Sequence, residues 1–145
     1  MIQRIQSIYL VMASLLSGGL SFCLNLWTKV EGNSPVYTVN LFYGKSLMEV
    51  LVPICFIIST LILVSTIFLF KNRQLQFKLG RIAILINLFL LGLLIYLSLT
   101  LSGEATVSKK GIGMFIPVFI ILLTVLANRA IRRDENLVKS VDRLR

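Results

Sequence analysis

Four long apolar runs dominate the chain, and none of them contains Asp, Glu, Lys or Arg. A helix rises about 1.5 Å per residue, so about 20 residues span the roughly 30 Å hydrocarbon layer of a bilayer. Strands seldom exceed ten residues, and backbone groups in hydrocarbon must bond within their own segment, which favours helix. We therefore predict four transmembrane helices over Ile8–Trp27, Val50–Phe70, Ile82–Leu101 and Ile112–Ala127, extended to about residues 5–27, 48–70, 79–101 and 112–133.

The connections between these helices are short, which favours neighbours that run antiparallel. The predicted fold class is therefore an all-α membrane protein in which four transmembrane helices form an up-down bundle. Residues 1–145 make a single domain, and a helical tail follows the last span over about residues 134–145.

The connection after the first span has the pattern of a small β-hairpin. Gly32–Pro35 is a turn signal between Trp27–Val30 and Val36–Leu41, which are rich in β-branched and aromatic residues. Ala105–Val107 in the connection after the third span is suited to an edge strand. The alternative is an irregular loop whose aromatic side chains anchor in the lipid headgroups, namely Trp27, Tyr37 and Tyr43.

Small and polar residues within the spans recur at three-and-four spacing, on one face of each helix. Small residues let helix backbones approach, and hydroxyls and amides bond between helices. A substrate path is the alternative use, but transport proteins usually place ionisable groups inside the membrane, and the runs contain none. We predict a helix-packing stripe of Ser14, Gly18, Ser21, Ser59, Thr66, Asn87, Thr124 and Asn128.

The composition agrees with a membrane protein, because 57% of the residues are hydrophobic and 14% are charged. The net charge of +9 falls unevenly: eleven Lys and Arg lie with the termini and the middle connection, and four lie in the other two connections. Cytoplasmic loops carry an excess of Lys and Arg, so we predict cytoplasmic N- and C-termini. This orientation explains the charge without nucleic acid as a partner.

The residues of familiar catalytic and metal sites are missing from the sequence. No histidine is present, which removes His-containing zinc sites and Ser-His or Cys-His pairs. The six acidic residues form no metal or dyad spacing, and Cys23 and Cys55 lie in apolar runs without a C-x-x-C pair. We expect a non-catalytic protein without cofactor or metal.

The C-terminal region combines an arginine cluster with an apolar stripe at helical period. Arg129, Arg132 and Arg133 follow the last span, where we expect them to contact lipid headgroups. Beyond them, a solvated helix that folds back on the middle connection is one interpretation. The other is a docking face for a partner protein, formed by Leu137, Val141 and Leu144.

The two ends of the chain carry a resemblance to a known family. Met1–Leu10, Leu126–Glu135 and the closing Asp142–Arg145 resemble a Bacteroidetes family of small four-helix integral membrane proteins, a domain of unknown function. The resemblance implies the inner membrane of a Gram-negative cell, with lipid as the surrounding partner. It implies no catalytic or binding residues.

Two functions follow as hypotheses from these patterns. The first is an accessory or structural subunit of an inner-membrane complex, which contacts other proteins through its tail or its first outer loop. The alternative is a small transporter or lipid-binding membrane protein that uses the polar stripe and the arginine cluster.

Overall fold

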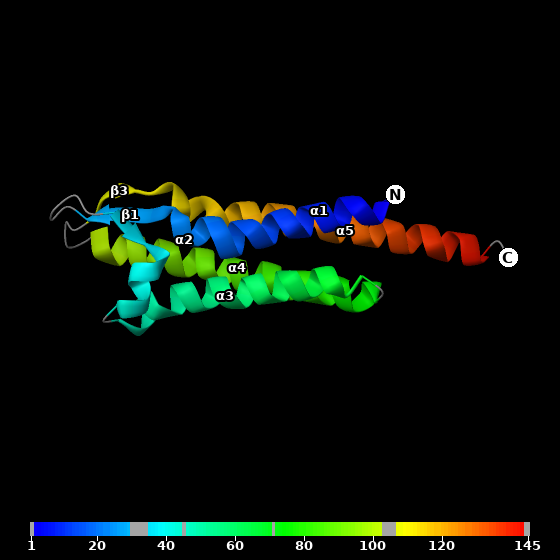
Figure 1. Ribbon diagram of the computed structural model, residues 1–145, viewed down its shortest axis with the longest axis horizontal. Helices are drawn as coiled ribbons and strands as arrows, with labels where there is room; N and C mark the ends of the chain where they lie inside the picture. Colours follow the sequence, from blue (N-terminus) through cyan, green and yellow to red (C-terminus); the bar gives the residue numbers. More distant parts are fainter. Residues whose placement is uncertain (1, 30–34, 45, 71, 103–106, 144–145) are drawn as a thin grey trace.

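The computed structural model describes residues 2–29, 35–44, 46–70, 72–102 and 107–143, which form a rod of parallel and antiparallel helices. A small β-sheet closes one end of the rod, called here the sheet end (Figure 1). Both termini lie at the other end (Figure 1), called here the basic end because most Lys and Arg residues of the sequence belong to the termini and the middle connection. The predicted all-α membrane class, with a small β element, is confirmed.

The first span consists of three consecutive helical pieces, α1 (Ile2–Leu15), the π-helix η1 (Leu16–Leu20) and α2 (Ser21–Cys23). The predicted bound at residue 27 is wrong, because the backbone turns extended at Leu24 and enters strand β1 (Asn25–Lys29). The apolar pattern continues through these residues, but their backbone groups pair with other strands instead of continuing the helix.

The other three spans are single long helices, α3 (Leu47–Phe68), α4 (Arg73–Ser102) and α5 (Ile116–Arg143). α4 begins six residues before the predicted 79, because polar residues continue the helix outside the apolar run. α5 continues without a break through the predicted tail, so residues 134–143 are part of the same helix. A 3-10 turn, η4 (Ile112–Phe115), precedes it.

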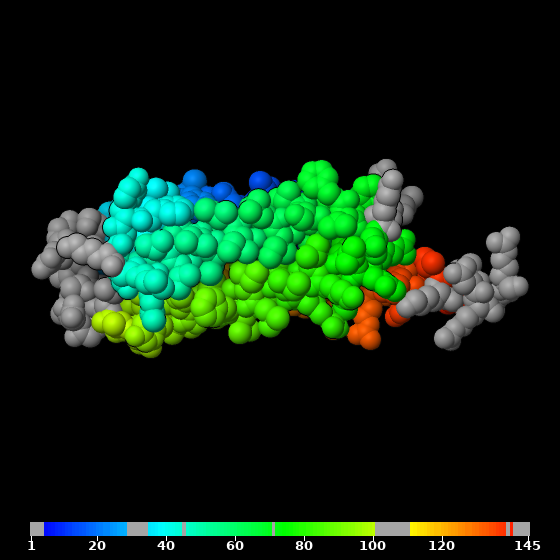
Figure 2. Space-filling view, turned by 90° about the horizontal axis from the view of Figure 1, so that it is seen from below, coloured from blue at the N-terminus to red at the C-terminus, as the bar shows by residue number. Residues whose placement is uncertain are grey.

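The four spans form a closed ring in which each one packs on two neighbours. α3 packs between α1 and α4, while α5 packs between α4 and α1. This order follows the chain, as expected for an up-down bundle. Figure 2 shows the face formed by α3 and α4, with side chains of α5 emerging beside α4 at the basic end.

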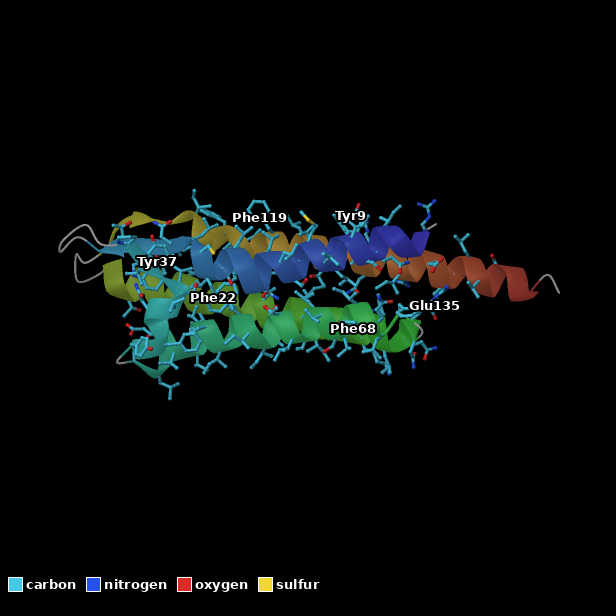
Figure 3. All side chains as sticks on the ribbon, in the orientation of Figure 1. Tyr9, Phe22, Tyr37, Phe68, Phe119 and Glu135 are labelled. Carbon is cyan, nitrogen blue, oxygen red and sulfur yellow. The ribbon has the colours of Figure 1, made fainter. Side chains whose placement is uncertain are left out.

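Four helices of the described chain are long and apolar enough to cross a membrane. Many of their large apolar side chains point outward: Phe68 is 76% exposed and Phe119 is 55% exposed (Figure 3). A soluble monomer rarely exposes large contiguous apolar patches. These apolar helices indicate a multi-pass membrane protein.

The sheet end contains three strands in the order β2-β1-β3. β1 pairs antiparallel with β2 (Pro35–Tyr37), which confirms the hairpin, and with the edge strand β3 (Val107–Lys110), which contains the last residue of the predicted Ala105–Val107. The turn residues 31–34 and residues 105–106 lie outside the described part. Thr38–Tyr43, whose first four residues were predicted as extended, form the 3-10 helix η3 instead.

The sheet is joined to the bundle by close backbone contacts. The amide of Gly111 donates to the carbonyl of Leu26 at 2.8 Å. A Cβ atom on Gly111 would lie 2.2 Å from the carbonyl oxygen of Asn25, and one on Gly113 would lie 2.7 Å from the same oxygen. Only glycine permits this approach. Leu26 and Trp27 of β1 are both fully buried and belong to the hydrophobic core.

Candidate functional site

The centre of the bundle holds one direct side-chain hydrogen bond between α3 and α4. The amide of Asn87 donates to the hydroxyl of Ser59 at 2.6 Å and to the carbonyl of Ala83 at 2.8 Å. Both side chains are fully buried. An interhelical bond of this kind contributes about 1 kcal/mol in a membrane. These two stripe residues therefore act together in helix packing.

A second polar contact joins the first span to α3. The hydroxyl of Thr60 donates to Ser17 at 3.0 Å, and Ser17 donates to the carbonyl of Phe56 at 3.2 Å. A Cβ on Gly18 would lie 2.7 Å from the methyl carbon of Thr60. Gly18 therefore permits the close approach of the two helices, as small residues do in membrane bundles.

The remaining stripe residues are placed differently from one another. Thr66 and Thr124 are buried, but each hydroxyl donates at 2.7 Å to a carbonyl of its own helix. Ser21 is buried and donates to the carbonyl of Ser17. Ser14 is not buried, and its hydroxyl donates to Val11 at 2.9 Å. The structure therefore brings most, but not all, of the stripe into the core.

Asn128, on α5, sits against a backbone notch in α4. It is 7% exposed, and its amide atoms occupy the space that a Cβ on Gly80 would need, with Oδ1 at 2.2 Å from that position. Among the described residues, Oδ1 has no hydrogen-bond partner. This contact fixes the rotation of α5 about its axis relative to α4.

A groove between α4 and α5 opens beside this contact at the basic end. Its volume is about 220 Å³. Three arginines line it, together with the amide of Asn128, an aromatic ring and two apolar side chains further along the helices: Arg81, Arg129, Arg132, Asn128, Phe77, Ile84 and Val125. The Arg81 guanidinium carbon lies 4.3 Å from the centre of the Phe77 ring, a cation–π contact. We call these seven residues the arginine groove.

The arginine groove combines predicted residues with residues that sequence analysis missed. Arg129 and Arg132 were predicted as headgroup contacts, and the structure places both in the groove. Arg133 instead lines a neighbouring hollow on α5, shared with Arg129 and Arg132. Arg81 and Phe77 were not predicted, although Arg81 directly precedes an apolar run and Arg129 follows one. Because α4 and α5 are antiparallel neighbours, the start of the apolar run in α4 and the end of the apolar run in α5 lie at the same membrane surface.

The part of α5 beyond the bundle is anchored at its base by an ion pair. Arg73 Nη2 lies 3.1 Å from Asp134 Oδ2, with the two side chains 28% and 15% exposed. This contact brings the start of the tail to the middle connection, and the helix then continues outward past the other elements (Figure 1). Glu135 lies at this end, opposite Tyr37 at the sheet end (Figure 3).

The predicted docking face is described in part. Leu137 is 48% exposed, and its neighbour Val138 is 46% exposed. The side chain of Val141 and all of Leu144 lie outside the described residues. The stripe that contains Ile131, fully buried inside the bundle, reaches Val138 two turns later.

Within the described residues, no group of three or more His, Cys, Asp or Glu side chains is arranged to hold a metal ion.

Comparison with known proteins assigns the chain to a family. Neither the curated proteins nor the solved structures contain a match to the chain. Residues 2–144 match the family described as a domain of unknown function (DUF4293), which covers nearly the whole sequence. The chain therefore belongs to this family, as the resemblance of its two ends indicated.

Proposed function

We propose that this protein is a non-catalytic accessory subunit of an inner-membrane assembly, with both termini in the cytoplasm. The observation that carries the proposal is the continuation of α5 beyond the bundle with its apolar stripe uncovered. The excess of Lys and Arg at the basic end supports the orientation, because positive loops remain on the cytoplasmic side.

The uncovered apolar stripe of α5 continues a row of residues that are buried in the bundle, which distinguishes it from a solvated helix face. Ala127 and Ile131 are fully buried against the bundle, and Val138 continues their row one heptad after Ile131. α1 and α4 begin near this level, so they leave the later turns of α5 without a neighbour (Figure 1). An amphipathic helix with an uncovered apolar row is a common recognition element for a protein groove.

A charge placed on this row tests the proposal. We expect Val138→Glu to remove the protein from a larger complex on native gels of mildly solubilised membranes, because a buried unpaired charge opposes docking. The matched control is Asn136→Glu, which adds the same charge to an exposed position on another face. The proposal fails if wild type migrates as a monomer, or if both variants leave the complex equally.

The arginine groove favours a second candidate function, a lipid-binding membrane protein. A groove with three arginines at the end of the spans is suited to an anionic headgroup. This candidate does not depend on the uncovered row of α5, and each can hold without the other.

A further inference from the structure

We propose that the arginine groove is a binding site for the phosphodiester of an anionic glycerophospholipid. The proposal rests on the lipid-binding candidate above and gives it a location and a ligand class. The groove contains residues of α4 and α5 that are about 50 positions apart in the sequence. Free phosphate offers the arginines the same anionic oxygens as the lipid phosphodiester. The apolar half of the groove favours the lipid over free phosphate.

The charges at the mouth of the groove are suited to a phosphate. Arg81 comes from α4, and Arg129 and Arg132 come from α5, so their guanidinium groups face one opening from two sides. The carboxylate of Asp134 pairs with Arg73, which does not line the groove. Three guanidinium groups around one opening repel one another, and an anion between them offsets that repulsion. Arginine also binds phosphate with two parallel hydrogen bonds.

The Phe77 ring holds one of these cations in place. Arg81 lies one helical turn after Phe77 on α4, and its guanidinium stacks on that ring. Stacking leaves the N–H edge of a guanidinium available for hydrogen bonds. The ring therefore reduces the freedom that Arg81 would otherwise lose when it binds an anion.

The other half of the groove is apolar and points toward the membrane interior. Ile84 lies one turn further into the apolar run of α4, and Val125 lies one turn before Arg129 on α5. The volume of about 220 Å³ equals roughly seven water molecules at about 30 Å³ each, enough for a headgroup phosphate. Acyl chains continue outside it along exposed apolar residues of both helices, such as Leu85 and Leu122.

The contact of Asn128 with Gly80 sets the geometry of the groove. Each is followed directly by a groove arginine, Arg81 after Gly80 and Arg129 after Asn128. Because the amide fills the notch in α4, the two helices are held in one register at this level. The groove is therefore built on a packed part of the bundle and does not depend on the loops.

Native mass spectrometry tests the site with the full-length protein in detergent micelles. The probes are phosphatidylglycerol, phosphatidylcholine with the same acyl chains, and inorganic phosphate. We expect preferential retention of phosphatidylglycerol, and the variant Arg81→Gln with Arg132→Gln to lower its affinity at least about tenfold. The matched control is Lys78→Gln with Arg133→Gln, which removes the same charge outside the groove and should change affinity less than about twofold.

Each other outcome overturns the proposal at a defined step. Equal loss in both double variants would assign the binding to general charge, leaving a lipid-binding protein without this site. Equal retention of the two lipids by wild type would remove the lipid-binding candidate as well. Displacement of the lipid by equimolar inorganic phosphate would assign the site to the free anion. Arg129→Gln, at an exposed groove position, is the second variant if the double variant fails to fold.

Discussion

The helices are held together by different interactions at the two ends of the bundle. At the sheet end, three strands and two glycines close the helices with backbone contacts around a buried Trp27. At the basic end, the helices are held by an ion pair and an amide in a notch, and an arginine groove opens between two of them. The contacts at the sheet end close the bundle, and the proposals above give ligand or partner contact to the basic end.

The physical basis of this difference is the type of group exposed at each end. Backbone hydrogen bonds and glycine contacts tolerate little change, because any added atom meets another backbone. Long charged side chains rearrange at low cost and bind mobile anions or partners. Substitutions should therefore be most destabilising at the sheet end.

The largest expected effect is that of Gly111→Ala. Its Cβ would lie 2.2 Å from a backbone oxygen of Asn25 in β1, so the backbone at Gly111, directly after β3, must move away from β1 and the sheet must open. We expect a loss of about 3 kcal/mol in the free energy of unfolding, measured by denaturant titration in micelles. Gly92→Ala is the matched control, because nothing lies within 4 Å of its added methyl group. Similar losses in both variants would remove the distinction.

Gly80→Ala should have a smaller effect, since the atoms that its Cβ meets belong to the end of the Asn128 side chain. We expect a loss of about 2 kcal/mol. Asn128→Ala in the same chain should recover part of it, because it empties the space that the new methyl group needs. Unfolding of the two single variants and the double variant measures this coupling. Strictly additive losses in the double variant would contradict the contact between the Asn128 side chain and α4 at Gly80.

Asn87→Ala tests the hydrogen bond in the middle of the bundle. We expect a loss of about 1 kcal/mol, with a similar loss for Ser59→Ala and a double variant less destabilised than the sum. The control is Thr124→Val, whose hydroxyl donates to its own helix and should change stability by less than about 0.5 kcal/mol. Equal effects of Asn87→Ala and Thr124→Val would contradict the assignment.

Arg73→Gln should have the smallest effect. The ion pair with Asp134 is partly exposed, so we expect a loss of about 0.5 kcal/mol at low salt that disappears at high salt. Lys78→Gln, which removes a charge from an exposed position on the same helix, is the control. Hydrogen exchange over residues 134–143 should become faster in Arg73→Gln alone. A salt-independent loss would indicate a different role for Arg73.

The spans could be predicted from the sequence because their length and apolar character are set by the bilayer itself. Their predicted ends were less accurate: Leu26 and Trp27 continue the apolar run but belong to β1, since strand pairing with distant residues decides the conformation of their backbone. α4 begins early because residues 73–78 mix polar and apolar side chains, so their mean hydropathy is below that of a span although the helix includes them.

Part of the arginine groove was also predictable from the sequence. Arg129 and Arg132 follow an apolar run directly, which places them at a membrane surface. Arg81 and Phe77 join them only because α4 packs beside α5, and this pairing is a tertiary property. The hairpin was predictable because its turn and strand residues are local, whereas β3 pairs across about 80 residues.

The central claim is that the basic end and the sheet end lie on opposite sides of a bilayer, with the basic end in the cytoplasm. Cysteine labelling in intact cells tests it most directly, in a background with Cys23 and Cys55 replaced by alanine. A membrane-impermeant maleimide should label Val39→Cys at the exposed surface of η3 and should label Ser140→Cys only after the membrane is opened. Labelling of Ser140→Cys in intact cells, with Val39→Cys protected, would contradict the account.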